Sequence, residues 1–346
     1  MGSMRIGIDK RVLALLVLGL LVILIFLYLF VDIHKTIKAI SSADPLLCTL
    51  ALISVLSGVF FYALTWEVIL RAVSEPLGIW RAFQYVCTSI FLSIILPAGT
   101  LTGETTRTYL TVKNSYSNPG SVVASIISHR TLDMIPFLGG SCVALLFMYM
   151  NHQFLGYTIY IVSSLIFLVI LTISLVLYLV LRPQRTEGIL NALFRLVARV
   201  YKRPEKLAKW KEMAAKQLRL FHEGIERLTV RPSTIPLALL CSALSYSADI
   251  IAIKLIFRAL GLDVPFSVIL TAYTIAIAVQ TIPVGLPGMT GPVEISMITV
   301  YSMAGISPAI GAAATLIMRS MNLWFEMALG GVMAYWVGLK ALRGGS

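Results

Sequence analysis

The chain has 346 residues, of which 58% are hydrophobic and 13% charged, whereas soluble proteins have roughly 45–50% and about 25%. This composition excludes an ordinary soluble domain, a disordered chain and a secreted disulfide scaffold. The formal charge of +12 does not indicate nucleic-acid binding, because basic residues of membrane proteins gather in cytoplasmic loops and contact anionic headgroups. We therefore predict an all-α polytopic protein of the cell membrane, with no nucleic-acid partner.

Six stretches are apolar for long enough to cross a bilayer, which takes about 20 helical residues. In chain order they are Val12–Val31, Leu46–Leu70, Ser121–Met150, Tyr157–Leu181, Pro236–Phe257 and Pro308–Leu339. Residues 4–342 are predicted to form a single transmembrane domain, and residues 1–3 and 344–346 resemble cloning remnants. The four cysteines lie in apolar stretches without CxxC spacing, so we interpret them as small buried hydrophobic residues.

Two shorter apolar segments, Ala82–Leu96 and Phe266–Ile282, each run into a stretch rich in Pro and Gly. Each is followed by a weakly helical piece, Thr105–Thr111 in the first case and Glu294–Met303 in the second. Short interrupted segments at corresponding places in two halves are typical of re-entrant or broken helices that line a site. We predict six full spans with two re-entrant hairpins, or eight crossings if the hairpins cross.

The orientation follows from the distribution of Lys and Arg. Residues 183–232 carry 12 basic and 5 acidic residues, with apolar stripes that begin at Ile189 and Leu207. We predict that this region forms amphipathic helices on the cytoplasmic leaflet, in contact with anionic headgroups, and that both termini are cytoplasmic. This orientation places Lys35 and Lys38 outside, against the positive-inside rule.

Four sequence marks recur in the same order in two halves, about 46–150 and about 236–340. The offsets between them are 187, 190, 189 and 191 residues, for the pairs Ile69–Val73 and Ile256–Leu260, Pro97–Gly99 and Pro287–Gly288, Arg130–Asp133 and Arg319–Asn322, and Gly139–Gly140 and Gly330–Gly331. In the predicted topology one hairpin hangs from the cytoplasmic side and the other from the external side. These are inverted repeats, the architecture of alternating-access carriers.

Ionisable side chains deep in a span are costly and usually functional. Arg130 lies well inside its span with Asp133 one turn further on, and Arg319 with Asn322 repeats this spacing. One interpretation is an Arg–Asp pair that only staples helices together. The other is a cationic pocket for a phosphate, in which Asp133 orients the guanidinium of Arg130 for bidentate contact.

Two glycine-rich loops fit a phosphate pocket, because glycines let backbone N–H groups and a helix N-terminus face an anion. The loop residues assigned to substrate binding are Gly99, Gly103, Glu104 and Arg107 in the first half and Gly288, Gly291 and Glu294 in the second. For the two glutamates the alternatives are a helix cap, a proton or cation relay, or a clasp for an ammonium group.

Asp249 lies inside the fifth span and is predicted to face the same cavity. His129 has Asp133 four residues on, but no further His or Cys completes a metal site. The chain carries no Walker A, dinucleotide-binding or GxSxG motif. We expect neither an enzyme nor a metal or other cofactor.

Three runs together resemble the lysylphosphatidylglycerol synthase/flippase transmembrane family, the flippase domain of the multiple peptide resistance factor. They are LPAGTLTGETTRTYL, SHRTLDMIPFLGG and PVGLPGMTGPVEISM, with the late Arg319, and the resemblance covers residues from about 8 to 342. It implies a lipid flippase with two halves around a central cavity lined by the residues named above. The family's soluble aminoacyl-transferase domain is missing from this chain.

The resulting hypothesis is a flippase for a phosphate-bearing lipid: a phospholipid, an aminoacyl-phospholipid or a polyprenyl-phosphate-linked lipid. The alternatives are a secondary transporter of a small soluble anion, or a membrane scaffold that docks a glycosyltransferase through residues 183–232. A separate lipid-modifying enzyme is the other partner considered. The sequence assigns no oligomeric state.

Overall fold

The structure is a computed structural model that describes residues 32–96, 99–115, 117–151, 157–200, 204–231, 233–280 and 286–343. The elements within these ranges are all helical, which confirms the predicted all-α class for the described part of the chain. The predicted first span, Val12–Val31, lies outside the described residues, as do residues 1–3 and 344–346.

Three helices are long and apolar enough to cross a membrane: α3 (Pro45–Val73), α6 (Pro119–Asn151) and α10 (Thr234–Ala259). They coincide with three predicted spans, and α7 (Tyr157–Val180) coincides with a fourth. The start of α3 has a clear local cause. The carboxylate of Asp44 accepts hydrogen bonds from the backbone of Leu46 and Leu47, and Pro45 stands at the first helical position.

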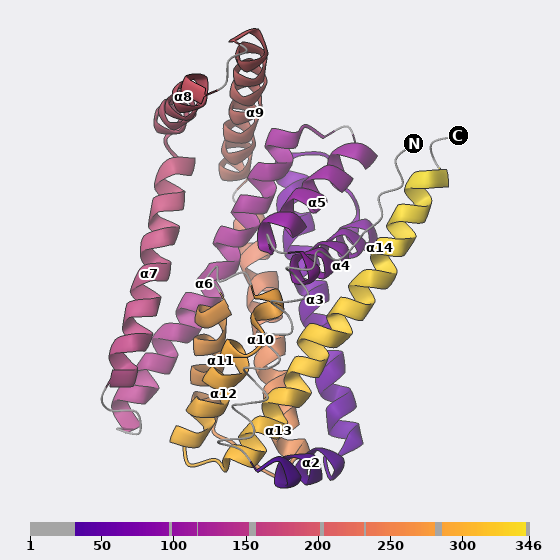
Figure 1. Ribbon diagram of the computed structural model, residues 1–346, viewed down its shortest axis with the longest axis vertical. Coiled ribbons are helices and arrows are strands. Elements are labelled where there is room, and N and C mark those ends of the chain that lie inside the picture. The colour runs from indigo at the N-terminus through magenta and orange to yellow at the C-terminus, as the bar shows by residue number, and fades with distance from the viewer. Residues whose placement is uncertain are drawn as a thin grey trace.

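Helices α3 and α10 form an antiparallel pair at the centre of the molecule (Figure 1). At one end the backbone N–H of Asp44 donates to the carbonyl oxygen of Ala259, at 2.9 Å. Midway along the pair, the hydroxyl of Ser245 donates to the carbonyl oxygen of Gly58, also at 2.9 Å. The missing side chain at Gly58 lets the two helices approach closely, as small residues do between membrane helices.

Two helical hairpins lie toward opposite ends of this pair (Figure 1). The first, α4 (Ile79–Ile95) and α5 (Thr100–Asn114), lies toward the end that carries α8 and α9. The second, α11 (Phe266–Gln280) and α12 (Pro292–Met303), lies toward the end that carries α2, with the short turn η1 (Pro287–Met289) before α12. Both helices after the predicted loops are longer than expected, because each begins directly after a glycine with positive φ.

The last predicted span, Pro308–Leu339, is not one regular α-helix. The structure divides it into α13 (Pro308–Arg319), a π-helical turn η2 (Ser320–Phe325) and α14 (Glu326–Arg343). A π-turn adds a residue to the helical register and commonly marks a functional site. Here it follows directly after Arg319 and contains Asn322.

Residues 183–232 form two helices, α8 (Pro183–Val200) and α9 (Pro204–Val230), as the sequence predicts. Helix α9 buries Phe221, Ile225 and Leu228 against α3 and α6. Helix α8 runs crosswise to α7 and leaves apolar side chains exposed, among them Leu193 and Leu196 (Figure 1). An exposed apolar stripe on a crosswise basic helix is typical of a helix that lies at a membrane surface.

A short helix at the opposite end, α2 (Ile33–Ser41), accounts for Lys35 and Lys38. Its exposed apolar side chains Ile33, Ile37 and Ile40 are spaced four and three residues apart and so share one face. The two lysines belong to an amphipathic helix rather than to a loop.

Candidate functional site

In the first half, an arginine of α6 pairs with a glutamate of α5. Nε of Arg130 lies 2.7 Å from Oε1 of Glu104, and the two side chains are 38% and 26% exposed. The expected partner of Arg130, Asp133, instead accepts a hydrogen bond from the hydroxyl of Ser242 on α10, at 2.7 Å. This corrects the prediction: the short Asp133 side chain is engaged by α10, whereas the longer Glu104 reaches Arg130 from the neighbouring helix.

The second half contains the same pair. Nε of Arg319 lies 2.5 Å from Oε1 of Glu294, and these side chains are only 9% and 3% exposed. The other carboxylate oxygen of Glu294 accepts the backbone N–H of Gly291 at 2.7 Å, which caps α12. Nη2 of Arg319 donates to the carbonyl oxygen of Gly288 at 2.6 Å. Glu294 therefore acts both as the predicted cap and as the partner of a buried cation.

The two pairs stand 189 and 190 residues apart in the chain, the offset of the sequence marks. They differ in access: the pair of the first half is partly exposed and the pair of the second half is enclosed. The enclosed pair is also held by more hydrogen bonds, through Gly288 and Gly291.

Arg107 gives the first half a second cation. It lies in α5 with 1% of its surface exposed, and its guanidinium carbon is 4.4 Å from the centre of the Trp66 ring. Its Nε and Nη2 have no hydrogen-bond partner in the described part of the chain. The positions 189 and 190 residues further on are Ser296 and Met297, so the second half has no counterpart to this arginine.

Aromatic residues around this cluster were missed by sequence reasoning. Tyr62 of α3 lies below Arg130, at 5.8 Å between ring centre and guanidinium carbon, and packs against His129 at 4.4 Å between ring centres. His129 is fully buried, and neither ring nitrogen has a described hydrogen-bond partner. Tyr62 and Trp66 are four residues apart on one helix, but nothing in the sequence says which helix they face.

The glycines of the two loops have different functions. Gly99 (φ +54°) and Gly288 (φ +58°) take left-handed backbone conformations, which favour glycine. Gly291 precedes α12 with φ +101°. Gly103 corrects the prediction of a loop cradle. It lies inside α5, where a Cβ would stand 2.5 Å from the carbonyl oxygen of Ser89, so it serves the close approach of α5 to α4.

Further polar residues lie between the two pairs. The hydroxyl of Tyr273 on α11 donates to the carboxylate of Asp249 on α10. Asp133 and Asn322 are within electrostatic reach of Asp249, and Glu326 is within reach of both Asp249 and Arg319. The predicted Asp249 and Asn322 thus join the two halves. The described residues contain no group of three metal-ligating side chains.

Lys254 follows Asp249 on α10 and was expected to reach for the membrane interface. Its Nζ lies 2.8 Å from a carboxylate oxygen of Asp263 in the loop after α10, and it also donates to the carbonyl oxygen of Val264. Hydrogen bonds from Lys254 and Arg258 lower the pKa of Asp263. Lys254 therefore belongs to the end of the helix and not to the central polar residues.

Known proteins share this arrangement of sequence. Residues 14–330 match the family described as the lysylphosphatidylglycerol synthase TM region, so the chain belongs to that family. It is similar to a UPF0104 membrane protein of Pyrococcus horikoshii, with 27% identity over 92% of this chain and 95% of the relative. It is also similar to a UPF0104 membrane protein of Methanothermobacter thermautotrophicus, with 26% identity over 84% of this chain and 86% of the relative. The protein is a membrane protein, and its family suggests a lipid-related function in the membrane.

Proposed function

We propose that this protein is a lipid flippase, not an enzyme, and that it moves a phosphate-bearing lipid between the leaflets. The observation that carries the proposal is the repeated Arg–Glu pair, partly exposed in one half and enclosed in the other. A guanidinium is the side chain best suited to bidentate contact with a phosphate. A phosphate that reaches Arg130 would compete with the carboxylate of Glu104 for the same N–H groups.

Inverted repeats would explain why the pair occurs twice. Gly58 and Ser245, which are hydrogen-bonded to each other, are 187 residues apart, the same offset as the Ile69–Val73 and Ile256–Leu260 marks. Two antiparallel helices that cross at equivalent residues are related by a two-fold axis through the crossing. Such an axis across the bundle would carry the hairpin α4–α5 onto the hairpin α11–α12 at the opposite end, and we propose that both are re-entrant.

The charges support an anionic headgroup at the first half. Arg107 and Arg130 together exceed the single charge of Glu104, whereas Arg319 and Glu294 balance each other. The buried guanidinium of Arg107 also has N–H groups free to donate. A phosphate would supply the acceptors and the negative charge that this cluster lacks.

Headgroup translocation in proteoliposomes tests the proposal. Vesicles would contain a fluorescent phosphatidylglycerol, an aminoacyl-phosphatidylglycerol or a polyprenyl phosphate, and the readout is the fraction of lipid that moves between leaflets. We expect protein-dependent movement of at least one lipid, and its loss in Arg130→Gln. Arg258→Gln is the matched control, because Arg258 is an exposed arginine at the far end of α10, and it should move lipid like the wild type.

The alternatives give different outcomes. A carrier of a small soluble anion would leave all lipids in place and take up radiolabelled phosphate into the vesicles. A scaffold would do neither, although the protein is folded. Either result would overturn the proposal.

A further inference from the structure

A second cationic cavity lies away from the Arg–Glu pairs, at the end of the bundle that carries α9. It has a volume of about 280 Å³, comparable to small ligand sites of roughly 300 Å³. Three segments meet there: the end of α3 and its following turn, the start of α6, and the end of α9. Its charged and polar lining includes Arg71, Glu75, Ser117, Asn118, Arg227 and Arg231.

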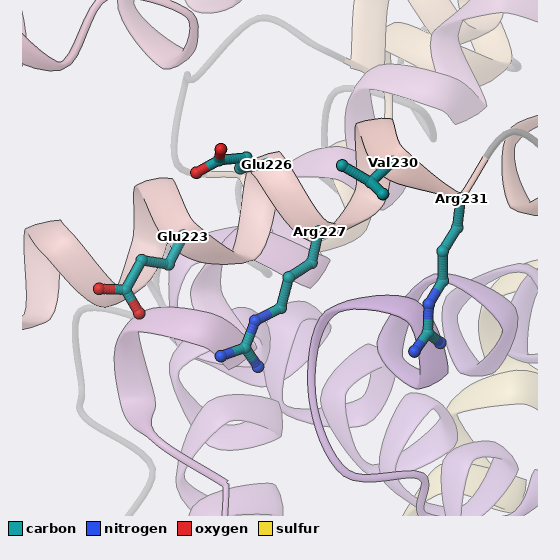
Figure 2. Close-up of a pocket in the computed structure, with 5 residues that line it drawn as sticks. All are labelled: Glu223, Glu226, Arg227, Val230 and Arg231. Atoms are coloured by element: carbon teal, nitrogen blue, oxygen red, sulfur yellow. The ribbon is translucent and has the colours of Figure 1, made fainter.

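The arginines of α9 are directed into this region. Figure 2 shows the side chains of Arg227 and Arg231 extending in the same direction from the end of α9, while Glu226 extends to the other side. One N–H of Arg231 is used by the carbonyl oxygen of Arg71, at 3.0 Å. Arg227 forms no ion pair with a residue that the structure describes.

The positive charge of the cavity is not cancelled from within. Arg71 is paired with the buried Glu67, at 2.7 Å between Nε and Oε1. Of the remaining lining residues, Arg227 and Arg231 carry two positive charges and Glu75 carries one negative charge. The cavity therefore retains a net positive charge when no anion is bound.

Helix dipoles explain part of this arrangement, because arginines are favoured at the C-terminal ends of helices such as α3 and α9. They do not explain Ser117. Its residue is only 7% exposed, it lines the cavity, and its hydroxyl has no hydrogen-bond partner among the described residues. A buried hydroxyl without a partner costs stability unless a ligand or water satisfies it.

We propose that this cavity binds a phosphate ester, with Arg227 and Arg231 providing charge and the Ser117 hydroxyl a directional hydrogen bond. The ester can come from the headgroup of an anionic lipid or from a soluble phosphate compound. This inference is independent of the proposed flippase activity, because none of these residues belongs to the Arg–Glu pairs. The site joins α3, α6 and α9, so an anion bound there would tie the start of α6 to the rest of the bundle.

Binding to the purified full chain in phosphatidylcholine nanodiscs tests the site. One arm adds phosphatidylglycerol to the nanodisc, and the other adds glycerol phosphate to the buffer; native mass spectrometry and the shift in melting temperature report binding. The test variant is Arg227→Gln with Arg231→Gln. The matched control is Lys216→Gln with Arg219→Gln, which removes two exposed charges from the same helix outside the cavity.

We expect the test variant to bind the lipid or the soluble ester at least about ten-fold more weakly, and the control to stay within about two-fold of the wild type. Ser117→Ala removes one hydrogen bond and should weaken binding about three-fold, which covers the case in which the double variant does not fold. Binding in the lipid arm alone identifies a headgroup; binding of glycerol phosphate identifies a soluble ligand. The proposal is overturned if neither probe binds, or if the control loses as much affinity as the test variant.

Discussion

The hydroxyl of Ser245 donates a hydrogen bond to the carbonyl oxygen of Gly58, and these residues stand 187 positions apart, at the offset of the first recurring mark. The contact lies where α3 and α10 cross at close range. A Cβ on Gly58 would stand 3.4 Å from both the Cβ of Ala248 and the carbonyl oxygen of Ser245, which leaves no room for a larger side chain. The crossing is therefore the most sensitive point of the central helix pair.

Gly58→Leu should destabilise the protein by about 1–3 kcal/mol, because a bulky side chain at this crossing must push the two helices apart. Thermal unfolding in detergent measures the effect. Gly139→Leu is the control, since a Cβ at Gly139 of α6 meets no heavy atom within 4 Å. Equal melting temperatures for the two variants would show that the crossing is not tightly packed in solution.

The two Arg–Glu pairs should differ in their contribution to stability. Glu294→Gln leaves the enclosed Arg319 without a counter-charge, which typically costs about 3–5 kcal/mol for a buried pair. Glu104→Gln affects a partly exposed pair, where the loss is about 1 kcal/mol or less. Denaturant titration of the two variants beside the wild type measures this difference. If both lose the same stability, the two pairs are equally enclosed in the membrane.

Gly103→Ala should separate α5 from α4 and abolish activity, because the added Cβ would lie 2.5 Å from the backbone carbonyl oxygen of Ser89. It would also lie 2.0 Å from the Ser93 hydroxyl. Ser93→Ala combined with Gly103→Ala should therefore not restore activity, since the backbone clash remains. Translocation by Gly188→Ala, at an open position of α8, should match that of the wild type. Rescue by the Ser93 change would mean that only the side-chain contact matters.

The predicted orientation places α9 in the cytoplasm and the turn after α2 outside. In a variant without native cysteines, Glu212→Cys on α9 should react with a membrane-impermeant maleimide only after the cells are opened. Ser42→Cys, an exposed residue between α2 and α3, should react in intact cells. Labelling of both residues from one side would contradict opposite placement of the two ends.

Length, composition and periodicity were sufficient for much of this protein. Apolar runs of about 20 residues or more determine membrane helices almost alone, because backbone groups in lipid must be satisfied within the helix. Leu46–Leu70, Ser121–Met150 and Pro236–Phe257 were therefore predicted close to their observed bounds, and the basic region 183–232 as amphipathic helices. The functional arginines and glutamates also stood out in the sequence, because charges in apolar segments are rare.

Only the tertiary structure decided which charge meets which. Spacing along α6 suggested that Asp133 would hold Arg130, but Glu104 holds it from another helix, and Ser242 of α10 engages Asp133. Neither contact could be read from one helix, because both depend on how α5 and α10 pack against α6. The same applies to Gly103, whose close neighbour lies on α4. A local pattern specifies which residues share a face of a helix, whereas the partner of that face is set by the packing of the whole chain.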